Sequence, residues 1–170
     1  MARNRLIRRI VLSLALGLLP LAAGAMPSSC ADPAYKQFDF WLGDWNVTTP
    51  DGKLVGRDHV EKLYGGCVLK ENWTGLQGGS GSSFNIYDAP RKLWHQTWVD
   101  SMGTLLVLEG GLKDGRMVLS GDQVQKDGSH LLNRITWAPQ DGTVRQTWDV
   151  SKDGGKTWKI VFDGIYKKAN

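Results

Sequence analysis

Side chains that bind metals or act as nucleophiles are scarce in this sequence, which has two cysteines and three histidines among its 170 residues. The cysteines are far apart, and the histidines at 59, 95 and 130 are scattered singly, so no metal-ligand spacing occurs. No serine lies in a G-x-S-x-G nucleophile elbow. We therefore predict neither a metal site nor a cofactor, and we expect each histidine to be a surface or packing residue.

Long apolar runs are confined to the start of the chain. Residues 1–9 are basic, residues 10–22 are apolar, and Ala23-Gly24-Ala25 has the small residues of a cleavage site. The apolar run is short for a membrane span, and Pro20 interrupts it. We therefore expect residues 1–25 to be a signal peptide that exports the mature chain to the periplasm or the medium, and we predict no membrane span in the mature chain.

A basic stripe, the signature of a nucleic-acid binder, is also missing. Four of the 21 Lys and Arg residues lie within residues 1–9, which leaves 17 basic against 17 acidic residues in the mature chain. This balance argues against a nucleic-acid partner. About 145 residues remain, enough for one domain with its own core. We expect an N-terminal tail over residues 26–37 and a single domain over residues 38–168.

The two cysteines, Cys30 and Cys67, both belong to the mature chain. In an oxidising compartment they are most simply one disulfide. The bridge would close a loop of about 37 residues, worth roughly 3–4 kcal/mol on the chain-entropy model. We expect it to hold the N-terminal tail against the domain.

Turn signals recur about every ten residues from residue 38 onward, which is typical of an all-β meander. Many are Asp-Gly pairs, which suit tight hairpins because glycine accepts a positive φ. Between them lie short runs rich in β-branched and aromatic residues, such as 104–110, 143–150 and 157–166. The count is about ten strands, and closure removes the two open edges that such a meander would leave. We predict a single closed antiparallel up-and-down β-barrel, wide enough for a small ligand.

Several motifs resemble an uncharacterised family of exported bacterial proteins. They are QFDFWLGDWNV (37–47), YGGCVLKENW (64–73), GSSFNIYD (81–88), LWHQTWVD (93–100), RITW (134–137) and KTWKIVFDGIYKK (156–168). The resemblance implies a lipocalin-like (calycin) barrel that forms a domain of unknown function, and it implies no activity or catalytic residue. The ten-strand pattern is more distantly similar to haem-binding nitrobindin barrels, but no motif here carries over their haem ligand.

Alternation along the strands predicts which side chains enter the barrel. If the tryptophan-bearing faces point inward, an indole wall surrounds a few polar groups, which is typical of ligand pockets. The alternative is a packing network in which Glu71 and Arg134 form an internal ion pair. The candidate ligand-binding residues are Glu71, Trp73, Gln96, Trp98, Arg134, Gln146 and Trp148.

The aromatic segment at residues 38–47 is predicted to be the first strand. Its aromatic side chains would either plug one end of the core or contact a ligand, and Gly43 would allow a bend or bulge. The segment 151–158 matches the Asp-box pattern S-x-D-x-G-x-T-W of propeller hairpins. One copy in a short chain cannot build a propeller, so we interpret it as a turn-stabilising device. The glycine-rich segment 75–83 lacks the lysine of a phosphate-binding loop and suits a loop at the barrel mouth.

Three functions are compatible with this pattern. The first is an exported barrel that binds a small apolar or amphipathic molecule. The second is a small envelope enzyme in which buried Glu71 is a general acid or base, with Asp100 as the nearest second carboxylate. The third is a solid barrel that binds other proteins through an exposed patch of Trp41, Trp45 and Tyr87.

Overall fold

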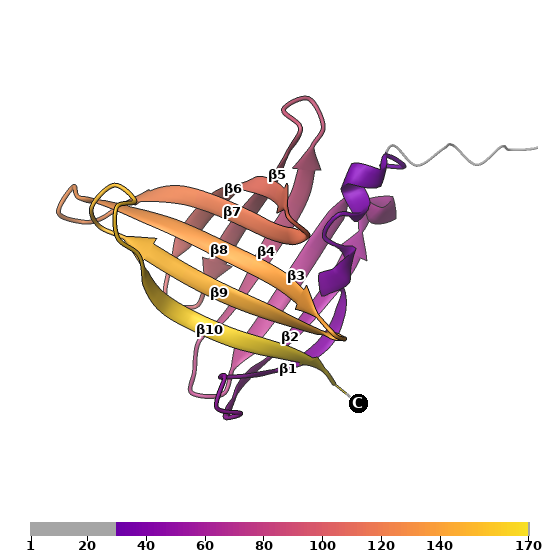
Figure 1. Ribbon diagram of the computed structural model, residues 1–170, viewed down its shortest axis with the longest axis horizontal. Helices are drawn as coiled ribbons and strands as arrows, with labels where there is room; N and C mark the ends of the chain where they lie inside the picture. The colour runs from indigo at the N-terminus through magenta and orange to yellow at the C-terminus, as the bar shows by residue number, and fades with distance from the viewer. Residues whose placement is uncertain (1–29, 170) are drawn as a thin grey trace, which may run out of the picture.

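A computed structural model describes residues 30–169, which form a closed barrel of ten antiparallel strands (Figure 1). Each strand pairs with its neighbours in the sequence, and β1 also pairs with β10, so the predicted up-and-down topology is confirmed. The predicted signal peptide lies outside the described residues. The strands are β1 (Gly43–Thr48), β2 (Leu54–Leu63), β3 (Val68–Gly75), β4 (Ser80–Asp88), β5 (Leu93–Asp100), β6 (Leu105–Lys113), β7 (Arg116–Val124), β8 (His130–Gln140), β9 (Thr143–Ser151) and β10 (Lys159–Lys168).

Tight hairpins made by Asp-Gly pairs connect β6 to β7 and β8 to β9. In the first, Asp114 has a φ of 49° and Gly115 a φ of 75°; in the second, Asp141 has 37° and Gly142 has 80°. Two successive positive φ values define the turn whose twist matches that of the flanking strands. The chain therefore reverses within two residues at these turns. The strand pairs β6–β7 and β8–β9 are in register without a bulge.

The aromatic N-terminal segment plugs one end of the barrel, but not as a strand. Phe38 and Trp41 are fully buried, stack with ring centroids 5.0 Å apart, and pack on Trp137 from β8. The segment forms the short 3-10 helix η2 (Asp39–Trp41), and β1 begins only at Gly43, whose φ of 123° lets the chain turn into the sheet. The prediction of a strand over residues 38–42 is wrong, whereas the aromatic plug is present.

The Cys30–Cys67 disulfide is formed, as predicted. It ties the tail, which contains the 3-10 helix η1 (Pro33–Lys36), to the segment directly after the 3-10 helix η3 (Tyr64–Gly66) and before β3. Figure 1 shows these N-terminal turns, in indigo, against the barrel. Within residues 30–169, no helix is long and apolar enough to cross a membrane.

Candidate functional site

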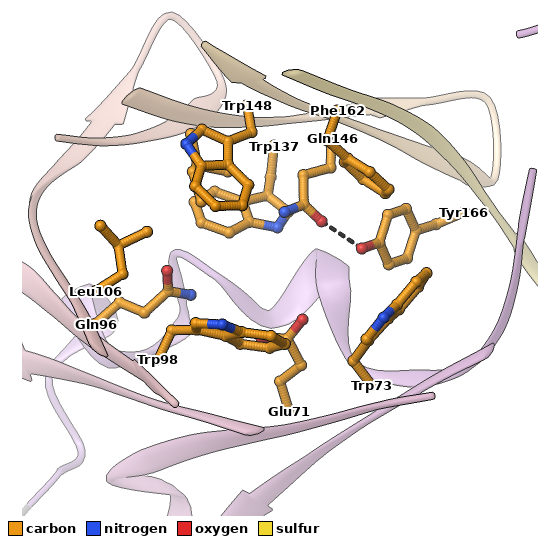
Figure 2. A pocket seen from close by; sticks show the side chains of 11 residues that line it. Glu71, Trp73, Gln96, Trp98, Leu106, Trp137, Gln146, Trp148, Phe162 and Tyr166 are labelled. Carbon is orange, nitrogen blue, oxygen red and sulfur yellow. Dashed lines mark hydrogen bonds between the residues drawn. The ribbon is translucent and has the colours of Figure 1, made fainter. Parts of the chain in front are cut away.

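A cavity of about 170 Å³ lies inside the barrel above the aromatic plug (Figure 2). Its floor is formed by Trp137 and Tyr166, which touch the plug. Away from the plug, half-buried aromatic side chains surround the cavity. They come from the C-terminal halves of β3, β5 and β9 and from the start of β10. These are Trp73, Trp98, Trp148 and Phe162.

Glycines on neighbouring strands make room for two of these indoles. A Cβ at Gly56 would collide with the ring of Trp73, and a Cβ at Gly81 would collide with the ring of Trp98. Each ring therefore lies over the bare backbone of the preceding strand, where any larger residue would displace it. This arrangement opens the centre of the barrel, because the indoles lie along the wall instead of crossing the lumen.

Six of the seven predicted binding residues line the cavity. They share the inward faces of β3, β5 and β9, as the alternation predicted. They are Glu71, Trp73, Gln96, Trp98, Gln146 and Trp148.

Arg134 lies outside the barrel, so its predicted inward placement is wrong. Its guanidinium is 3.6 Å from the Asp149 carboxylate and 4.1 Å from the centroid of the Trp158 ring. The inward residues of β8 are Asn133, Ile135 and Trp137. Apolar residues occur on both faces of this strand, and the buried Trp137 sets the phase. The Glu71–Arg134 ion pair, the alternative to a ligand pocket, is therefore not formed, since Arg134 pairs with Asp149 instead.

A chain of hydrogen bonds holds the polar side chains on the β3–β5 wall. The Ser83 hydroxyl donates to Glu71 Oε2 at 2.5 Å, and Asn85 Nδ2 donates to the Ser83 oxygen at 2.9 Å. Gln96 Nε2 in turn donates to Asn85 Oδ1 at 2.8 Å. These bonds hold the Glu71 carboxyl group through one oxygen, Oε2, which accepts from Ser83. Its other oxygen has no hydrogen-bond partner among the described residues and lies at the cavity (Figure 2).

The second carboxylate of the interior is Asp58, which the sequence analysis missed. It lies on the inward face of β2, diagonal to Glu71 on β3, and it is 3% exposed. Neither of its carboxylate oxygens accepts a hydrogen bond of good geometry within the described chain, and the nearby His59 amide only partly opposes the rise in its pKa. Its signal in the sequence was alternation: Asp58 shares the phase of Gly56 and Val60, both of which face inward.

Burial raises the pKa of both carboxyl groups. Desolvation, and then repulsion by Glu71, raise the pKa of Asp58 to about 9. Desolvation raises the pKa of Glu71 to about 7, against the hydrogen bond from Ser83, which favours the carboxylate. Because the two groups repel each other, they titrate as a pair, and near neutral pH the pair keeps a proton that ordinary carboxyl groups would have lost.

No positive side chain offsets this acidity, because the described residues lining the cavity include no Lys, Arg or His. Each histidine instead points outward to a surface carboxylate: His59 to Asp44, His95 to Glu109 and His130 to Asp122. The other polar lining groups are neutral, and the Tyr166 hydroxyl donates a hydrogen bond to Gln146. Across residues 30–169, no three His, Cys, Asp or Glu side chains are grouped to hold a metal ion.

Two other polar candidates are structural. Asp100 Oδ1 accepts hydrogen bonds from the amides of Met102 and Thr104, both at 2.9 Å, so it stabilises the β5–β6 turn and is not the partner of Glu71. In the Asp-box segment, Asp153 accepts from the Thr157 amide at 2.9 Å and from its hydroxyl at 2.6 Å. This contact closes the β9–β10 turn, in line with the turn-stabilising interpretation.

No protein-family model matches this chain, and no curated protein matches it. The fold and the geometry of the cavity therefore carry the functional argument, and the family resemblance stays a prediction.

Proposed function

We propose that this protein is an exported, lipocalin-like barrel that binds one small apolar or amphipathic molecule. The observation that carries the proposal is the cavity of about 170 Å³ inside the barrel, with an aromatic wall and a few fixed polar groups. Concave, mainly apolar sites with sparse polar groups are the usual form of small-molecule sites. Export by residues 1–25 is part of the proposal.

The volume limits the ligand to a small molecule. A cavity of about 150 Å³ engineered into another protein binds benzene, so about 170 Å³ suits a ligand of roughly six to nine non-hydrogen atoms. A larger ligand would need the half-buried aromatic residues at the mouth to move.

A pair of adjacent variants tests whether the cavity is the binding site. Leu106 lines the cavity and is 2% exposed, whereas its neighbour Val107 points outward and is 42% exposed. Leu106→Phe should fill the cavity, and Val107→Phe adds the same volume on the outer surface. Native mass spectrometry on protein from its own host would detect a retained ligand, and titration with cyclohexanol would measure binding through tryptophan fluorescence.

Binding that is lost in Leu106→Phe but retained in Val107→Phe supports the proposal. Equal binding by both variants would place the ligand elsewhere. If the protein from its host carries no small molecule and cyclohexanol does not bind at millimolar concentration, the proposal is wrong.

An enzyme is the second candidate, and the carboxyl pair is the observation that favours it. A general acid or base works best with a pKa near the operating pH, and Glu71 has a pKa of about 7 beside the second carboxyl group of Asp58. The test is a turnover screen of the wild type against Glu71→Gln and Asp58→Asn. Any turnover that survives both substitutions unchanged would exclude a catalytic role for the pair.

The third alternative, a protein-interaction module, loses the patch on which it was based. Trp41 is fully buried and Trp45 is 2% exposed, so neither can contribute to an exposed surface. Tyr87 is half-buried and packs against Tyr35 and Trp94.

A further inference from the structure

The acidity beside the cavity is unusual for an apolar binding site. Glu71 lines the cavity, and a second buried carboxyl group, Asp58, lies diagonal to Glu71 outside that lining. Glu71 is 4% exposed and Asp58 is 3% exposed, and the described lining contains no basic side chain. Buried carboxyl groups are normally paired with a cation or hydrogen-bonded. Here Ser83 satisfies one oxygen of Glu71, and neither oxygen of Asp58 accepts a hydrogen bond of good geometry within the described chain. A cation in the cavity would give the second oxygen of Glu71 a partner.

We propose that the cavity selects a small organic ammonium ion, with its nitrogen beside Glu71 and its hydrocarbon part against Leu106 and Ile135. This inference rests on the proposed function and names the chemical class of the ligand. Strand β8, which carries Ile135, lies opposite β3 in the ring of ten strands, so the ligand would cross the lumen from an acidic wall to an apolar one.

The aromatic wall supports a cation for an independent reason. The negative faces of indole rings attract ammonium groups, more strongly where water is excluded. Trp98 and Trp73 line the same cavity as Glu71, and in Figure 2 the Trp98 ring overlaps the Glu71 carboxyl group while Trp73 lies to one side of it. Trp73 also meets Phe162 edge to face, with ring centroids 6.0 Å apart, which continues the wall onto β10. An N–H of a protonated amine could therefore donate to the free Glu71 oxygen while the cation lies among aromatic rings.

Proton release gives the proposal a distinctive signature. The titratable groups facing Glu71 are Asp58 on β2 and the Tyr166 hydroxyl on β10. The raised pKa of about 9 keeps Asp58 protonated near pH 7, and burial raises the pKa of Tyr166 well above its usual value. The other facing polar groups, Ser83 on β4 and Gln96 on β5, are neutral. A bound ammonium ion would favour the charged form of the carboxyl pair, so binding near pH 7 should expel a proton.

The experiment compares three ligands that share one ring: cyclohexylamine, cyclohexanol and cyclohexanecarboxylate. Isothermal titration of the full mature protein near pH 7 should show the amine binding at least about tenfold more tightly than the alcohol, and no binding of the carboxylate. Repeating the amine titration in buffers of different ionisation enthalpy should reveal proton release, which the alcohol should not cause.

Glu71→Gln should weaken amine binding at least about tenfold and change alcohol binding by less than about threefold. Glu61→Gln is the matched control, because it makes the same substitution at a residue that does not line the cavity. Glu61 lies on β2 directly after the inward Val60. Asp58→Asn provides a second variant if Glu71→Gln does not fold, and it should reduce the proton release.

Equal affinity for the amine and the alcohol, or an amine affinity unchanged in both Glu71→Gln and Asp58→Asn, would overturn the ammonium proposal. In that case binding of the alcohol would leave the proposed binding function standing. If none of the three ligands binds, the ammonium proposal is wrong, and the search for a retained ligand in protein from its host then decides the binding function separately.

Discussion

Glu71→Gln is predicted to stabilise the protein at alkaline pH and to bring no gain at acidic pH. A carboxyl group whose pKa is higher in the folded state binds more protons there than in the unfolded state, so folding stability falls as the pH rises. For Glu71 the pKa rises from 4.5 to about 7, which corresponds to about 3 kcal/mol lost between these pH values. Glutamine has the same shape, carries no charge and can still accept the hydrogen bond from Ser83.

The expected gain is therefore about 3 kcal/mol at pH 8, or roughly 5–10 °C in Tm for a domain of this size. At pH 4 Glu71 is protonated in both states, so the gain should vanish or become a small loss. Removing Glu71 also relieves its repulsion of Asp58, which adds to the gain as the pH rises toward about 9.

Urea unfolding of the wild type, Glu71→Gln and Glu61→Gln at pH 4, 6 and 8 measures this difference. Surface carboxylates such as Asp88 and Asp153 have lowered pKa values, so their stabilising contribution is lost only as the pH falls below about 4. They cancel in the comparison between variants. A Glu71→Gln protein that is less stable than the wild type by the same amount at all three pH values would refute the argument, because the charge of Glu71 would then cost nothing.

Three further predictions concern the scaffold. Replacing Cys30 and Cys67 by serine should lower stability by roughly 3 kcal/mol and leave the β-barrel circular dichroism intact, and thiol titration of the denatured, unreduced wild type should find no free thiol. Phe38→Ala should cost about 3–5 kcal/mol in urea unfolding, because it removes a fully buried ring from the plug, and a loss under 1 kcal/mol would contradict the packing described. Asp153→Ala should lower Tm at pH 7, and the difference should shrink as the pH falls toward 2, since the Thr157 hydroxyl and amide hold the Asp153 pKa at about 2; a difference that does not change with pH would exclude the carboxylate as its cause.

The barrel was predictable from the sequence because its turns are chemically explicit. Asp-Gly corners mark several of the hairpins, and at least one tryptophan in each strand marks the inward faces of β3, β5 and β9. The plug was harder to predict. Phe38 and Phe40 alternate as strand residues do, but the two buried rings are Phe38 and Trp41, three residues apart. That spacing is one turn of a 3-10 helix, which places both rings on the same side.

The inward residues could be predicted for some strands and not for others. The assumption that tryptophan-bearing faces point inward assigned β3, β5 and β9 correctly. Applied to Trp137 on β8, the same assumption would have placed Ile135 inward and Arg134 outward. Asp58 escaped because its strand has no inward tryptophan to set the phase. An acidic residue flanked by His59 and Arg57 resembles an exposed charge until closure of the barrel shows which face is inside.

The carboxyl pair remains the feature that stability alone does not explain. Apolar residues that fill the space of a buried charged network often keep or raise stability, so a barrel optimised only to fold would have no need for acids at Asp58 and Glu71. The surrounding bonds, from Gln96 through Asn85 and Ser83 to Glu71, orient one carboxylate toward the cavity without neutralising it. A group that costs stability, is held in one orientation and lies beside aromatic rings is arranged as a binding group would be. On the ammonium proposal, its charge would select the ligand, because a cation offsets the cost of the buried acids and an anion increases it.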